Sequence, residues 1–170
     1  MIVYLQMIET AEDKDKFEQI YTAYRSLMFQ VALGILGNEN NAEDAVHQAF
    51  VSIISNLSKI SEVESPKTRA YIVIIVERKS LDIIRTNKKY TDELAEEQQG
   101  VAIPLPGDSP LADAMSRLPA HYREILLLKY DHGYSTKEVA EILDMSRAGA
   151  EKMLWRAKKA LAEALEREEG

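Results

Sequence analysis

The stretch from Ser135 to Leu161 constrains the fold of this chain more than any other. Ser135 is followed three residues later by Glu138, the spacing of a capping box in which each side chain accepts a hydrogen bond from the other residue's backbone. After a short apolar segment, Ser146 is placed to cap a second helix. A short helix, a tight turn and a longer helix are typical of a helix-turn-helix, whose second helix enters the DNA major groove. A helical hairpin with a solvated outer face would have the same pattern.

The second of these helices has two different faces when its residues are placed at about 100° per residue. The face predicted to be buried contains Ala150, Leu154, Ala157, Leu161 and Leu165. On the opposite face, Lys152 and Lys159 flank Trp155. We predict that this tryptophan points away from the core, toward DNA or a partner protein.

The charge of the chain is unevenly distributed. A net charge of −7 argues at first against nucleic acid, because binding to phosphates needs a basic surface. Residues 91–117, however, contain six acidic residues and one basic residue. Residues 1–90 and 118–170 are each close to neutral, with 12 acidic against 11 basic residues and 10 against 9. Both flanking parts can therefore present local basic faces.

Several classes of function are not expected from this sequence. There is no cysteine, and His47, His121 and His132 lack the spacing of metal ligands, so we predict no metal site and no cofactor. No Ser/His/Asp set, phosphate-binding glycine loop or HExxH motif is present, so we do not expect an enzyme. Without a signal peptide or an apolar run of about 20 residues, the chain is predicted to be cytoplasmic.

The chain is predicted to be all-α, with two small helical domains. Residues 1–89 form the first domain, residues 90–109 an acidic linker rich in proline and glycine, and residues 110–170 the second domain. The run YIVIIV has strand propensity, but the proline start and the spaced basic residues favour a helix. The long helices of the first domain are expected from Asp13 or Asp15 to Gly37, from Asn40 or Asn41 to Leu57, and from Pro66 to Lys89.

The chain resembles two-domain bacterial sigma factors of the extracytoplasmic-function group, in the sigma-70 family. NAEDAVHQAF at 41–50 is similar to the acidic region 2.2 motif. SPKTRAYIVIIVERKSLDIIRTNKK at 65–89 looks like regions 2.3 and 2.4. LPAHYREILLLKYDHGYSTKEVAEILDMS at 118–146 is similar to region 4, which usually opens with L-P-x-x-x-R-E. The order of these motifs, separated by an acidic linker, is specific to the family.

The resemblance implies that the chain binds core RNA polymerase, directs it to promoters and helps to melt them. The first domain would hold the clamp coiled coil of the largest subunit through Glu43, Asp44, His47 and Gln48. The third helix and the loop at 59–65 would open and read the −10 element, with Arg69, Tyr71, Arg78, Lys79, Arg85, Lys88 and Lys89 as contacts. The second domain would sit on the flap of the second-largest subunit and read the −35 element through Ser135, Thr136, Arg147, Lys152, Trp155, Arg156 and Lys159. The linker would occupy the basic channel of the polymerase, and an anti-sigma factor would silence the protein.

Departures from the family pattern leave alternatives open. Asn41, His47 and Gln48 stand where the family more usually has an acid, a glutamine and a glutamate, so the polymerase-binding face carries less negative charge. Arg78 stands where many members have an asparagine. Glu151 and Met153 replace common basic residues of the recognition helix, and Glu151 either accepts a hydrogen bond from cytosine N4 or repels phosphate. Two other functions are a decoy that sequesters an anti-sigma factor and a plain helix-turn-helix regulator.

Overall fold

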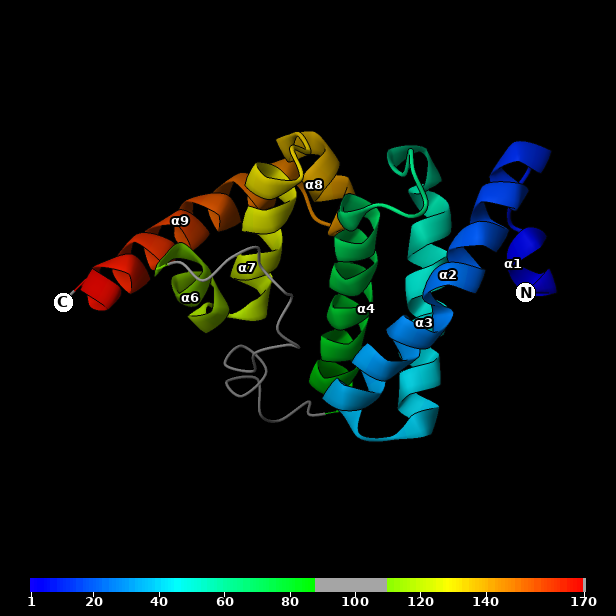
Figure 1. The fold of residues 1–170 in the computed structure, drawn as a ribbon, viewed down its shortest axis with the longest axis horizontal. Helices are drawn as coiled ribbons and strands as arrows, with labels where there is room; N and C mark the ends of the chain where they lie inside the picture. Colours follow the sequence, from blue (N-terminus) through cyan, green and yellow to red (C-terminus); the bar gives the residue numbers. More distant parts are fainter. Residues whose placement is uncertain (88–109, 170) are drawn as a thin grey trace. The chain divides into compact units, whose positions relative to one another are not determined.

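The computed structural model describes residues 1–87 and 110–169. The chain divides into two compact units, Met1–Tyr90 and Thr91–Gly170. Every regular element within the described residues is a helix, so the all-α prediction is confirmed (Figure 1). The predicted acidic linker at 90–109 and the predicted DNA contacts Lys88 and Lys89 lie outside the described residues.

The first unit is built on three long helices that pack against one another: α2 (Ala11–Leu36), α3 (Glu39–Ser55) and α4 (Pro66–Asn87). A four-residue helix, α1 (Ile2–Leu5), packs on α3, and a short 3-10 helix, η1 (Leu57–Lys59), follows α3 (Figure 1). The core residues have almost no exposed area and recur at three- and four-residue steps, as amphipathic helices require. They include Phe17, Ile20, Met28, Ala45, Phe50, Ile53 and Ile72.

Two helix starts differ from the sequence prediction. The N-cap of α2 is Thr10, whose side chain accepts a hydrogen bond from the Asp13 amide at 3.1 Å. Glu12 and Asp13 then lie in the first turn, where the helix dipole favours carboxylates. The N-cap of α3 is Asn38, whose Oδ1 accepts from the amide of Asn41 at 3.0 Å. The cap falls this early because left-handed Gly37 ends α2, as predicted, and Asn38 directly after it has the extended backbone of a cap.

The YIVIIV run lies inside α4, so the preference for a helix over a strand is confirmed. Pro66 is the first helical residue, where its missing amide costs nothing. Ser65 Oγ accepts from the Thr68 amide at 3.1 Å and so caps the helix. Seven consecutive residues at 71–77 are buried, which explains why the run has no polar face.

The second unit contains α6 (Pro110–Arg117), α7 (Ala120–Leu126), a π-helical turn η2 (Leu127–Asp131), α8 (Thr136–Ile142) and α9 (Arg147–Glu169). The first three of these α-helices pack against α9. The sequence predicted a single helix up to Gly133, but its last turn is a π-helix, which the apolar pattern does not distinguish from an α-helix. Helix α9 continues to Glu169, so four of the five residues at 166–170, which were expected to fray, are helical in the structure.

The helix-turn-helix prediction for Ser135 to Leu161 is confirmed in its local geometry. The Ser135 amide donates to Glu138 Oε1 at 3.0 Å, and the Glu138 amide donates to Ser135 Oγ at 3.1 Å. Ser146 Oγ accepts from the Gly149 amide at 3.0 Å at the start of α9. Ala150, Leu154 and Ala157 are buried as expected, whereas Leu161 and Leu165 are only half-buried.

Candidate functional site

The outer face of α3 carries the four residues predicted to bind the polymerase. Glu43, Asp44, His47 and Gln48 are all exposed. Their spacing of one, three and one residues places them on one side of the helix. The opposite side is buried against the bundle through Ala42, Ala45, Val46, Ala49 and Phe50. The sequence pattern therefore identified a continuous polar face.

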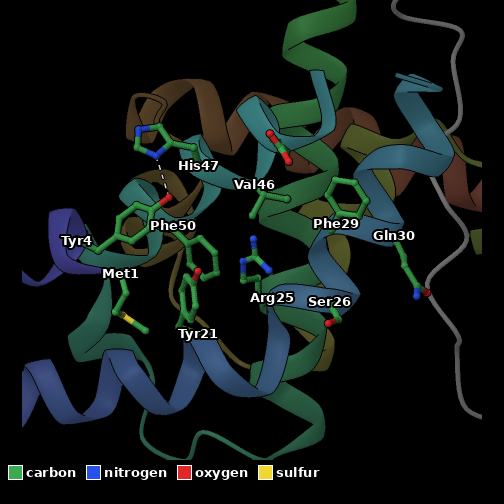
Figure 2. Close-up of a pocket in the computed structure, with 11 residues that line it drawn as sticks. Met1, Tyr4, Tyr21, Arg25, Ser26, Phe29, Gln30, Val46, His47 and Phe50 are labelled. Atoms are coloured by element: carbon green, nitrogen blue, oxygen red, sulfur yellow. Dashed lines mark hydrogen bonds between the residues drawn. The ribbon is translucent and has the colours of Figure 1, made fainter. Parts of the chain in front are cut away.

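A pocket of about 600 Å³ adjoins this face and is lined by α1, α2 and α3. Figure 2 shows Tyr4 and His47 at one end, joined by a hydrogen bond, and Arg25 pointing into the pocket beside Tyr21. Glu43 and His47 belong both to the pocket and to the exposed face of α3. The remaining lining residues are Met1, Ser26, Phe29, Gln30, Val46 and Phe50.

Aromatic contacts hold the pocket together. The Tyr4 hydroxyl lies 2.8 Å from His47 Nδ1, and the Tyr4 and Phe50 ring centroids are 5.3 Å apart. The rings of Tyr21 and Phe50 stack at 5.1 Å, and the Arg25 guanidinium lies 5.7 Å from the Tyr21 centroid, within cation–π range. Burial raises the pKa of Tyr4, neighbouring Tyr21 raises it further and Arg25 opposes the rise. Sequence reasoning missed this cluster because its members come from three separate helices.

The basic residues predicted for the −10 element lie in different environments along α4. Arg69 and Arg85 are exposed, and Arg85 pairs with Asp82 at 3.7 Å. Arg78 and Lys79 are half-buried. Tyr71 is a correction, because its ring has 0% exposed area and cannot stack on a base in this structure. The residue belongs to the buried run of α4, where an aromatic side chain contributes to the core.

The predicted −35 contacts lie on the surface of α8 and α9. Ser135, Lys152, Arg156 and Lys159 are exposed, and Thr136 is half-exposed. Arg147 is also exposed and pairs with Glu151, one turn further along α9, at 3.5 Å. This pair places a carboxylate beside the first cation of the helix.

The predicted outward orientation of Trp155 is confirmed, with 64% of the residue exposed. Lys159 Nζ lies 5.4 Å from its ring centroid. A second pair of this kind joins Lys158 of α9 to exposed Tyr130, at 5.0 Å from the ring centroid. The sequence did not reveal this second pair, because Tyr130 and Lys158 are distant along the chain.

Comparison with known families decides what these two units are. Residues 20–90 match the model described as Sigma-70 region 2, and residues 109–161 match Sigma-70, region 4. The chain belongs to the extracytoplasmic-function (ECF) group of the sigma-70 family. It is therefore an RNA polymerase sigma factor.

Relatives of this sigma factor match it over most of its length. It is 26% identical to the ECF RNA polymerase sigma factor SigW of Bacillus subtilis over 171 residues, 90% of each chain. Sigma factor SigM of the same organism is 25% identical, over 85% of this chain and 91% of SigM. Among solved structures, the sigma factor RpoE of Bartonella quintana, in complex with the anti-sigma factor NepR, matches 88% of this chain and 96% of that chain, with 17% identity and a TM-score of 0.44.

The described part of this sigma factor has neither a metal-binding cluster nor a membrane-spanning helix. Within residues 1–87 and 110–167, no cluster of three or more histidine, aspartate and glutamate side chains is placed to hold a metal ion. Within the same ranges, no helix is long and apolar enough to span a membrane.

Proposed function

We propose that this sigma factor holds the clamp coiled coil of the largest polymerase subunit through the outer face of α3 and the adjoining pocket. The four polar residues of α3 offer hydrogen-bond acceptors and negative charge to a helical partner. The pocket adds what the sequence prediction lacked, a recess lined by both aromatic and polar side chains, with Arg25 pointing into it and the Tyr4–His47 hydrogen bond at one end. A central aromatic recess with a polar rim is the arrangement that concentrates binding energy at protein interfaces.

Promoter contacts are proposed for the remaining surfaces. The −10 element would meet Arg69, Arg78, Lys79 and Arg85 of α4, together with the loop before that helix. Tyr71 is removed from this set by its burial. The −35 element would meet the first turns of α8 and α9 and the basic face around Trp155, with this unit seated on the flap of the second-largest subunit.

Three further parts of the proposal follow from the same role. The domains are residues 1–89 and 110–170, with residues 90–109 as an acidic linker in the basic channel of the polymerase. The protein acts by binding and not by catalysis, and it acts in the cytoplasm, where polymerase and promoter meet. An anti-sigma factor that covers the polymerase- and DNA-binding faces remains a prediction from the family resemblance.

The observation that carries the proposal is the presence of both sigma domains, in family order, with the predicted polymerase-binding residues exposed on a single face. The test is run-off transcription with purified protein, core polymerase and the genomic DNA that flanks its own gene. We expect a specific transcript that is absent with core polymerase alone. Failure to bind core polymerase would refute the proposal. Binding without initiation would favour the decoy, and promoter binding without core polymerase would favour a plain regulator.

A further inference from the structure

The loop that joins α3 to α4, residues 56–65, is held through its backbone carbonyls by two side chains of α2. Lys16 Nζ donates to the carbonyl oxygens of Leu57 and Ile60, at 3.3 and 2.9 Å. Tyr24, about two turns further along α2, donates from its hydroxyl to the Val63 carbonyl at 2.5 Å. Helix α2 therefore contacts three carbonyls that are spread over most of the length of the loop.

Helix α4 supplies a further contact to the loop. The Thr68 hydroxyl donates to the carbonyl oxygen of Glu62, next to the carbonyl that Tyr24 binds. Ser65 Oγ lies 3.3 Å from the same Glu62 oxygen. Backbone carbonyls accept these bonds, so the side chains at 61, 62 and 64, which are exposed, take no part in them.

Apolar packing holds only the first half of the loop. Leu57 and Ile60 are buried, whereas the residues at 61, 62 and 64 are exposed. A pocket of about 390 Å³ lies between α2 and part of the second half, and is lined by Asp15, Glu18, Gln19, Thr22, Ala23, Val63 and Glu64. Polar contacts are therefore the main restraint on that half.

The environment of Tyr24 favours a strong hydrogen bond. The residue is only 7% exposed, so little water can compete with its hydroxyl for the Val63 carbonyl. Burial raises the pKa of Tyr24, the negative charge of Glu64 raises it further and Arg69 lowers it. The hydroxyl thus stays protonated as a donor, near one of the cations that we assign to the −10 element.

We propose that Lys16 and Tyr24 are positioning residues, which hold the loop at 56–65 in one conformation before DNA arrives. This inference rests on the proposed function, in which the loop meets an unpaired base of the −10 element. A base that leaves the stack needs a preformed binding site. Unstacking already costs free energy, and ordering the loop at the same moment would add to that cost. Neither residue needs to touch DNA.

The test uses full-length variants, with core polymerase and the promoter located by run-off transcription. Tyr24→Phe removes only the hydroxyl, and Lys16→Met removes the charged donor while keeping the side-chain length. Lys16→Arg is the conservative rescue, because a guanidinium can donate to both carbonyls. Lys14→Met is the matched control, since Lys14 donates no hydrogen bond to the loop among the described residues.

Two readouts separate positioning from general stability. Hydrogen exchange of the free protein should become faster at amides 61–65 in Tyr24→Phe and Lys16→Met. Open-complex formation, followed by permanganate reactivity of unpaired thymines, should fall by about 2- to 10-fold in Tyr24→Phe, the effect of one lost hydrogen bond. The fall should be larger in Lys16→Met, which loses two hydrogen bonds. Binding to core polymerase should stay unchanged, and Lys16→Arg and Lys14→Met should behave as wild type.

Each other outcome has a distinct meaning. Unchanged exchange at 61–65 would overturn the role of the two side chains, whatever happens in transcription. Faster exchange with normal opening would show that loop order does not matter for melting, and would overturn the proposal. If wild-type protein binds no core polymerase or opens no promoter, the proposed function itself fails, and the positioning role with it. Equal loss of core binding and opening would indicate a merely structural role.

Discussion

Replacing Glu151 with glutamine should strengthen binding to −35 DNA. In the structure the Glu151 carboxylate lies 3.5 Å from Arg147, and the two side chains are 60% and 69% exposed, so the pair partly neutralises the first turn of α9. A carboxylate about 7 Å from a phosphate repels it by about 0.6 kcal/mol in water. Removing this charge should tighten binding roughly 3-fold. Release of Arg147 to a phosphate should also steepen the dependence of log K on log salt by about 0.9.

The assay is a salt series of holoenzyme binding to a duplex that carries the −35 element. The matched control is Glu163→Gln, on the same helix, exposed, and about 18 Å further along its axis. This control should leave affinity and salt slope unchanged. The opposite result would refute the reasoning: if Glu151 accepts a hydrogen bond from cytosine N4, the substitution should weaken binding by about 1–3 kcal/mol, and only while that base pair is present.

The remaining predictions concern the basic face of α9, a helix cap and two buried tyrosines. Replacing Lys152 and Lys159 together with glutamine should lower the salt slope of −35 binding by about 1.8, and an unchanged slope would remove both from the interface. Ser135→Ala should destabilise the second unit by about 1 kcal/mol in urea unfolding, through loss of the N-cap, and a change below about 0.3 kcal/mol would contradict this. Burial raises the pKa of Tyr24 and Tyr134 above the ordinary tyrosine value of 10.0. The stability that each protonated hydroxyl contributes to the folded state is therefore complete below pH 10.0 and is lost as the pH rises through the raised pKa. Tyr→Phe at either position should reduce the loss of unfolding free energy at alkaline pH. An unchanged dependence of that free energy on pH would contradict this role of the tyrosine.

Local signals predicted most helices of this chain. The capping box at Ser135, the proline at 66 and the left-handed glycine at 37 act within one turn of the residues that they order. Such features can be read from sequence because both partners are near neighbours. The N-caps of α2 and α3 were misplaced for the same local reason, since several capping residues compete within a few positions and tertiary packing selects among them.

Features that depend on distant partners could not be predicted. Helix α1 has only four residues, too short to form alone, and it packs through the Tyr4 side chain against a cluster that includes Phe17 and Phe50. The burial of Tyr71 is equally non-local, because an aromatic residue beside basic ones is consistent with either a nucleic-acid surface or a core. In the structure Tyr71 belongs to the core.

The predicted polymerase-binding residues illustrate the limit most clearly. Helical spacing was enough to place His47 and Glu43 on one exposed face of α3, since that depends only on the helix itself. Their neighbours in space are Tyr4 and Arg25, which come from two other helices and have no sequence relation to α3. His47 therefore has a second role that its replacement of the usual glutamine did not suggest. Its ring shares a hydrogen bond with the Tyr4 hydroxyl and so fixes one wall of the pocket. Tyr4 belongs to α1, which precedes the region that matches the family, so this departure from the family pattern is coupled to that helix.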